Sequence, residues 1–157
     1  MKTATVRELK KELNYRSQSE LVELCLSLSK FKKENKELLT YLLFESSDED
    51  AFIEGVKEEI KNNFEQINTK SYFYIKKSVR KILRNTKKYI RYSKKKETEV
   101  ELLLYFCEEL INMKPSIKYN VSLQNIYDRQ KITIKKVVST LHEDLQYDYG
   151  LELDNLE

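Results

Sequence analysis

Glycine, proline, histidine and cysteine are scarce in this sequence, and tryptophan is absent. Two glycines and one proline occur in 157 residues. Proteins built from β-sheets need both residues for their tight turns, whereas helices joined by short loops do not. Apolar residues also recur at helical spacing rather than in alternation. We therefore expect an all-α protein.

The shortage of reactive side chains argues against an enzyme. His142 is the only histidine, and no cysteines or histidines have the spacing of a metal site. Two glycines do not provide a phosphate-cradling loop. Adjacent acids such as Glu58 and Glu59 diverge around a helix, which suits solvation better than joint catalysis. We expect no enzymatic activity, no metal, no cofactor and no small-molecule substrate.

Long apolar runs are missing as well. A membrane-spanning helix needs about 18 or more consecutive apolar residues, and none occur here. The first residues are charged where a signal peptide is apolar. Cys25 and Cys107 each lie on the apolar side of a helical pattern, which predicts two buried, reduced thiols. The sequence therefore predicts a cytoplasmic protein that does not enter a membrane.

The apolar pattern predicts six or seven helices in one domain over residues 1–157. Thr5 with Glu8, Ser17 with Glu20 and Thr98 with Glu101 have the spacing of N-terminal capping boxes. The expected helices are one short helix within 1–16, then about 18–33, 35–45, 48–67, 71–94, 98–113 and 122–147. The segments 18–33 and 35–45 are alternatively one long rod.

Short connections between these helices favour an antiparallel bundle or stacked helical hairpins. The apolar positions of 98–113 cover the widest arc, so we expect this helix at the centre of the core. Residues 148–157 are acidic and contain Gly150, where the order of the chain is expected to end. This composition predicts a frayed tail.

Charge is distributed very unevenly along the chain. The formal net charge of the whole sequence is only +3. Residues 70–96, however, contain 12 lysines and arginines and no acid, whereas 1–69 carry a net charge of −3 and 97–157 a net charge of −6. The chain is therefore mildly acidic outside residues 70–96 and contains one intensely basic element.

The basic element separates cleanly into two faces when it is drawn as a helix. With Ile75 at 0° and about 100° per residue, Val79, Ile82 and Leu83 gather on one side, and the cations occupy about 100° to 240°. The predicted polyanion-binding residues on or beside the charged side are Lys76, Lys77, Arg80, Lys81, Arg84, Lys87, Lys88, Arg91, Tyr92, Lys94 and Lys95. Tyr89 and Tyr92 are candidates for stacking against unpaired bases.

Three interpretations of this charged face remain open. In the first, the face is a solvated surface that acids of 48–67 or of the C-terminus neutralise in part. In the second, the face contacts the phosphate backbone of RNA or DNA. Adhesion to an anionic membrane is disfavoured, because the apolar side would have to leave the core.

The words "KSVRKILRNTKKYIRYSKKKETEVELLLYFC" and "STLHEDLQYDYG" give the sequence a resemblance to known proteins. Together with "LSKFKKENKELLTYLLFE", they resemble a group of small helical bacterial proteins of unknown function, mainly from the Bacteroidetes. The likeness covers about residues 18–150. It implies a small cytoplasmic helical protein and supplies no catalytic or binding residues.

These observations together predict a non-enzymatic interaction protein. Its partner is another protein or a second copy of the chain, with non-specific binding of a nucleic-acid backbone as the alternative. Protein interaction would be accompanied by an exposed apolar patch away from the basic helix or by a stable oligomer.

Overall fold

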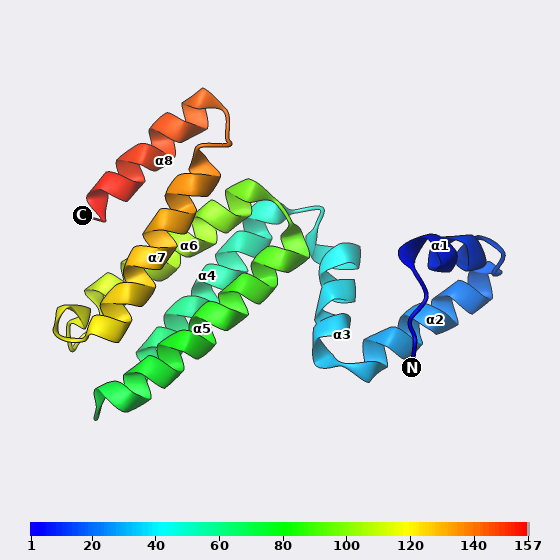
Figure 1. Cartoon of the computed structure of the whole chain (residues 1–157), viewed down its shortest axis with the longest axis horizontal. Coiled ribbons are helices and arrows are strands. Elements are labelled where there is room, and N and C mark those ends of the chain that lie inside the picture. The colour runs from blue at the N-terminus through cyan, green and yellow to red at the C-terminus, as the bar shows by residue number, and fades with distance from the viewer. Residues whose placement is uncertain (157) are drawn as a thin grey trace. The chain divides into compact units, whose positions relative to one another are not determined.

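The computed structural model describes residues 1–156, and all of its regular structure is helical (Figure 1). This confirms the predicted all-α fold. The described residues form eight α-helices, slightly more than expected, with one short π-helix and one short 3-10 helix. The sequence pattern predicts one domain, but the chain divides into two compact units, residues 1–44 (unit 1) and residues 45 onward (unit 2).

Unit 1 contains three helices in succession. They are α1 (Val6–Asn14), α2 (Gln18–Phe31) and α3 (Lys33–Thr40), followed by the π-helical turn η1 (Tyr41–Glu45), whose last residue opens unit 2. Lys32 is extended and separates α2 from α3, so this region is two helices rather than one rod. The amide of Asn35 donates to the carbonyl of Leu28 at 2.8 Å and closes the corner.

Both capping boxes expected in unit 1 are present. The Thr5 hydroxyl accepts from the Glu8 backbone N–H at 3.3 Å, and the Glu8 carboxylate accepts from the Thr5 backbone N–H at 2.7 Å. Ser17 and Glu20 repeat this exchange at 3.2 and 2.8 Å. Each box satisfies two backbone donors that have no partner within the helix, which fixes where α1 and α2 begin.

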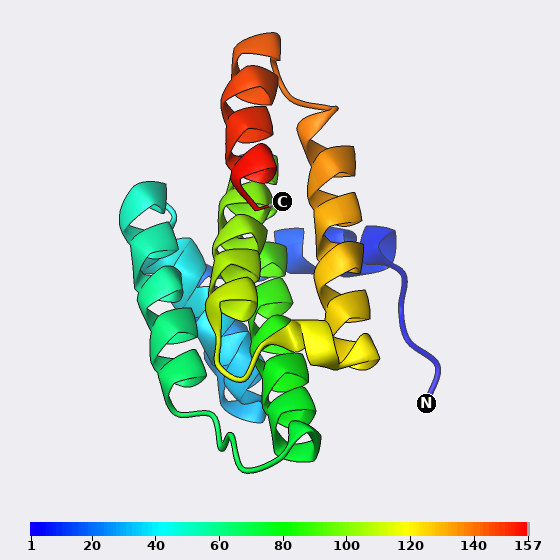
Figure 2. The same cartoon turned by 90° about the vertical axis from the view of Figure 1, so that its left-hand side faces the viewer.

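Unit 2 is an antiparallel array of five long helices. They are α4 (Glu49–Glu65), α5 (Tyr72–Ser93), α6 (Lys96–Asn112), α7 (Val121–Val138) and α8 (Glu143–Asn155), with the 3-10 helix η2 (Ile117–Tyr119) before α7. Helix α6 packs against α4, α5, α7 and α8. Figure 2 shows α6 in yellow-green, with α4 in teal on one side and α7 in yellow to orange on the other.

The core of unit 2 forms around α6, as its wide apolar arc predicts. Val100, Leu102, Phe106, Cys107 and Leu110 are each 0% exposed. Fully burying a leucine or phenylalanine side chain contributes about 1.5–3 kcal/mol. Because these residues point in several directions around the helix, α6 supplies apolar surface to all four of its neighbours.

The capping box expected at Thr98 does not exist. Helix α6 begins two residues earlier, at Lys96, and Lys95 occupies the N-cap position without a side-chain cap. Thr98 is 1% exposed, and its hydroxyl donates to the Glu49 carboxylate at 2.6 Å. The threonine therefore joins α6 to α4 instead of starting a helix.

The last part of the chain also differs from the expectation. The helix expected at 122–147 is two helices, because α7 ends at Val138 and His142 caps α8 by accepting from the Asp144 backbone N–H at 3.3 Å. The described part of 148–157 is helical rather than a frayed tail. Apolar residues at spacings of four and three explain this, since Tyr149, Leu153 and Leu156 are 6–8% exposed.

Candidate functional site

Helix α5 places its cations on the outer side of unit 2. The structure confirms the helix expected at 71–94, and Ile75, Val79, Ile82 and Thr86 are at most 5% exposed on its inner side. We use the name basic surface for the cations within α5, which are Lys76, Lys77, Arg80, Lys81, Arg84, Lys87, Lys88 and Arg91. Five of these are exposed, and Lys76, Lys87 and Lys88 are half-buried.

Few contacts neutralise the basic surface. The Arg80 guanidinium donates to the Ser122 hydroxyl at 3.0 Å, and the Lys88 ammonium lies 4.8 Å from the ring centroid of Tyr89. Within residues 1–156, no ion pair joins the other six cations of this surface to a carboxylate. Their charge is therefore available to an external anion.

Two acids of α4, Glu54 and Glu59, contact residues outside the basic surface. Glu54 pairs with Lys57 at 3.4 Å, and Glu59 accepts from the Tyr89 hydroxyl at 2.8 Å. Lys57 also pairs with Glu101 of α6 at 3.0 Å. Neither the contact of Glu54 nor that of Glu59 joins the acid to a cation of the basic surface.

A second group of acids lies where α4, α6 and α8 meet. Burial and the nearby charges of Glu101 and Glu108 raise the pKa of Glu152 above its ordinary value. Burial, with Glu109 as the next cause, raises the pKa of Tyr105 to about 12. Unit 2 therefore has a negative region on α4, α6 and α8, separate from the basic surface on α5.

Three of the residues expected to bind a polyanion lie apart from the basic surface. Tyr92 is 8% exposed, so its ring is not accessible for base stacking. Helix α5 ends at Ser93, and Lys94 has a left-handed backbone with a φ of 60°. Lys95 pairs with Glu49 at 3.3 Å. Lys94 and Lys95 would join the charged face only if α5 continued through them, whereas Tyr92 lies within α5 but on a buried part of its circumference.

Two exposed aromatic residues lie beside the cations and are not among the site residues that the sequence predicts. Phe73 is 67% exposed and Tyr74 is 47% exposed, and their rings pack edge to face with centroids 5.5 Å apart. On the helical projection Phe73 falls at about 160°, in the middle of the charged face. This position is the signal that could have identified it.

Unit 1 exposes an unusual amount of apolar surface. Tyr41 and Ser29 are its only buried residues. The large apolar side chains that remain exposed, apart from Met1, are Val6, Leu9, Leu13, Tyr15, Val22, Leu24, Leu26, Leu28, Phe31, Leu42, Leu43 and Phe44. The sequence pattern predicts that the stripe containing Leu24, Leu28 and Phe31 faces a core, but 43%, 63% and 76% of these side chains are exposed.

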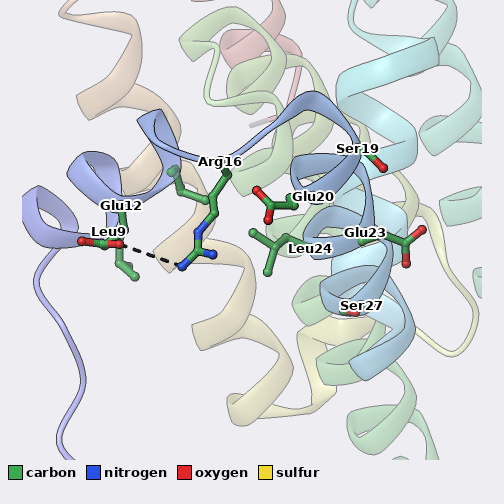
Figure 3. Close-up of a pocket in the computed structure, with 9 residues that line it drawn as sticks. Leu9, Glu12, Arg16, Ser19, Glu20, Glu23, Leu24 and Ser27 are labelled. Atoms are coloured by element: carbon green, nitrogen blue, oxygen red, sulfur yellow. Dashed lines mark ion pairs between the residues drawn. The ribbon is translucent and has the colours of Figure 1, made fainter.

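A groove of about 570 Å³ separates α1 from α2 in unit 1. Leu9, Leu13 and Leu24 supply its apolar lining, and Arg16 and Leu24 point into the space between the helices (Figure 3). Arg16, two residues beyond the end of α1, pairs with Glu12 of α1 at 3.9 Å. The groove is therefore lined by both apolar and charged side chains.

The two cysteines differ, contrary to the expectation that both are buried. Cys107 is 0% exposed on α6, and burial raises the pKa of its thiol to about 12. Cys25 is exposed on the apolar stripe of α2. The stripe has the helical spacing of a core face, but Leu38 and Leu39 of α3 and Leu42 of η1 face it across a pocket and leave Cys25 exposed.

The described residues contain no group of three or more histidine, cysteine or acidic side chains placed to hold a metal ion. None of their helices is both long enough and apolar enough to cross a membrane. Comparison with protein-family models, with curated proteins and with solved structures gives no match.

Proposed function

We propose that this chain is a non-enzymatic binding protein that self-associates through unit 1. The observation that carries the proposal is that eleven large apolar side chains of α1, α2 and η1 remain exposed. A stable protein interface needs roughly 800 Å² from each partner, and exposed apolar side chains gathered in one segment mark an interaction site.

The charges of unit 1 favour a second copy as the partner. Residues 1–17 contain five basic and two acidic side chains, whereas 18–31 contain two acidic side chains and one basic. In a two-fold symmetric pair, α1 of each copy lies against α2 of the other, so the same favourable attraction forms twice. The leucines of both helices are then covered by the leucines of the second copy.

Light scattering during gel filtration tests this proposal at low and high micromolar concentration. We expect the native chain to be dimeric and the double variant Leu28→Glu, Phe31→Glu to be monomeric. Both side chains are exposed, so the substitutions should not disturb the fold of a single chain. Ile132→Glu is the matched control, because Ile132 is 67% exposed on α7 of unit 2. A native chain that stays monomeric throughout contradicts the proposal.

The basic surface supports a second candidate function, which is binding to the phosphate backbone of a nucleic acid. Six cations that have no carboxylate partner among residues 1–156 lie along a helix of 22 residues, about 33 Å in length. Concentrating charge of one sign contributes little to stability, whereas it attracts a polyanion and releases its counterions. Asn85, at the border of the charged face of α5, is a single amide side chain and a weak signal for reading base edges, so the contact is expected to be non-specific.

Titration of labelled oligonucleotides at 50 and 200 mM salt tests the second function. We expect affinity to fall steeply with salt, and the double variant Arg84→Glu, Arg91→Glu to bind at least about tenfold more weakly with a salt slope smaller by about 2. The control, Lys61→Glu with Lys136→Glu, makes the same change in net charge on α4 and α7. Equal effects of the two double variants would show that only net charge matters.

A further inference from the structure

We propose that the basic surface binds single-stranded nucleic acid, with Phe73 and Tyr74 as a stacking platform for unpaired bases. This inference rests on the second candidate function above. It assigns a role to two side chains that phosphate binding leaves unexplained. It also replaces Tyr92, which is buried, as the source of base stacking.

Phe73 is continuous with the row of cations along the outer side of α5. Residues at spacings of four, seven, eleven and eighteen from Phe73 fall within about 40° of it on the helical projection, and these are Lys77, Arg80, Arg84 and Arg91. The row from Phe73 to Arg91 is about 27 Å long. A nucleic-acid strand that follows the cations therefore reaches the aromatic pair at the N-terminal end of the helix.

The end of unit 2 that carries the aromatic pair is held in place by α7 and η2. The Tyr72 hydroxyl donates to the Ser116 carbonyl at 2.9 Å, and Arg80 donates to Ser122 at the start of α7. Figures 1 and 2 show the start of α5 and η2 at the same end of unit 2. The platform is thus on a rigid helix rather than on a loop. Tyr119 in η2 is a further aromatic residue at this end and is 83% exposed.

Stacking distinguishes single strands from duplexes. Phenylalanine has no hydrogen-bonding group, so it contributes to polyanion binding through the faces of bases, and in a duplex those faces are covered by neighbouring bases. An edge-to-face pair presents one ring face and one ring edge to a base. Single-stranded RNA and single-stranded DNA both offer unpaired bases. Comparing the affinities for an RNA oligomer and a DNA oligomer shows which of the two the protein prefers.

A membrane surface fits the same region less well. Membrane-bound amphipathic helices insert a continuous apolar face, whereas the apolar side of α5 is the buried side. Ile75 and Val79 are 0% exposed and Ile82 is 5% exposed. Only the two rings at one end of α5 are available, and the rest of the row is cationic.

Fluorescence anisotropy of the full chain with labelled dT20, rU20 and a 20-base-pair DNA duplex tests the inference. We expect tighter binding of the single strands. The double variant Phe73→Ala, Tyr74→Ala should weaken single-strand binding about tenfold and leave duplex binding and the salt slope unchanged. Phe73→Trp should retain single-strand binding. Tyr147→Ala is the matched control, because Tyr147 is 69% exposed on the acidic helix α8.

The possible results separate this inference from the function on which it rests. If the native chain binds no oligomer at 50 mM salt, both fail. If Arg84→Glu with Arg91→Glu abolishes binding and the aromatic variant binds every oligomer as the native chain does, only the stacking inference fails. Equal affinity of the native chain for single strands and duplex also overturns it. The stacking inference is also overturned if the chain binds anionic phosphatidylserine vesicles more tightly than oligomers and this binding requires Phe73.

Discussion

Glu49, in the first turn of α4, accepts hydrogen bonds from the last residue of α5 and from the first turn of α6. The hydroxyls of Ser93 and Thr98 donate to its carboxylate, and the Lys95 ammonium lies 3.3 Å from it. Removing the carboxylate deprives the buried Thr98 hydroxyl of this acceptor, which costs about 1–3 kcal/mol. We predict that Glu49→Ala lowers the free energy of unfolding by about 2–3 kcal/mol, measured by urea denaturation.

Glu54→Ala is the control for that prediction. Glu54 is on the same helix, its side chain is 73% exposed, and its partner Lys57 has a second carboxylate, Glu101. A surface ion pair of this kind contributes about 0–1 kcal/mol. If both variants lose the same small amount of stability, the contacts of Glu49 do not stabilise unit 2.

The spacing of a threonine or serine and a glutamate does not by itself identify a helix start. Thr5, Ser17 and Thr98 all precede a glutamate by three residues, but only the first two begin helices. The polar lysines before Thr98 are compatible with either a loop or the first turn of α6. Because the partner of Thr98 is 49 residues away in the sequence, no local pattern could reveal it.

The composition of α8 does not indicate a helix. Its acids and Gly150 suggest a disordered tail, and a glycine inside a helix costs about 1 kcal/mol relative to alanine. Three apolar residues at helical spacing outweigh this cost by packing into the core, and the Tyr127 hydroxyl donates to the Leu156 carbonyl at 2.6 Å. A periodicity carried by so few residues is difficult to recognise among charged neighbours.

The position of Glu152 on α8 gives unit 2 a specific pH dependence. Partial burial, Glu101 and Glu108 on α6, and Asp148 on α8 raise its pKa, and Lys57 on α4 partly opposes them. The folded chain therefore holds this proton to higher pH than the unfolded chain does. The resulting contribution to stability is fully present below the ordinary glutamate pKa and is lost as pH rises through the folded-state pKa.

We predict that Glu152→Gln stabilises the protein at pH 7 by less than about 1 kcal/mol, because the residue is largely exposed. The advantage should disappear at pH 4, where Glu152 of the native chain is protonated. Urea denaturation at both values measures the difference. Asp154→Asn on the same helix controls for the loss of one negative charge. An equal gain in the free energy of unfolding of Glu152→Gln at pH 4 and pH 7 would contradict the raised pKa of Glu152.

Across the whole molecule, the sequence predicts the location of charge better than the location of apolar surface. The eight cations of α5 form one outward face because Ile75, Val79 and Ile82 fix the rotation of the helix. A stripe such as Leu24, Leu28 and Phe31 has the same periodicity whether a core or a second chain covers it. Periodicity identifies the apolar face of a helix but not the surface against which that face packs.

The distribution of buried residues leads to a final prediction about the two units. Every buried apolar side chain among the described residues, except Tyr41, lies in unit 2. A helical segment of about 40 residues without a core is only marginally stable in water. We therefore expect residues 45–157 alone to unfold cooperatively, with a midpoint close to that of the full chain, and 1–44 alone to be largely unfolded. Circular dichroism during thermal unfolding measures both.

The same fragment separates the two proposed surfaces. Residues 45–157 retain α5 and the aromatic pair, so they should bind oligonucleotides with nearly native affinity while remaining monomeric at high micromolar concentration. A fragment that still dimerises would place the self-association surface in unit 2. A folded fragment that loses oligonucleotide binding would assign part of that binding to the lysines and arginines of unit 1.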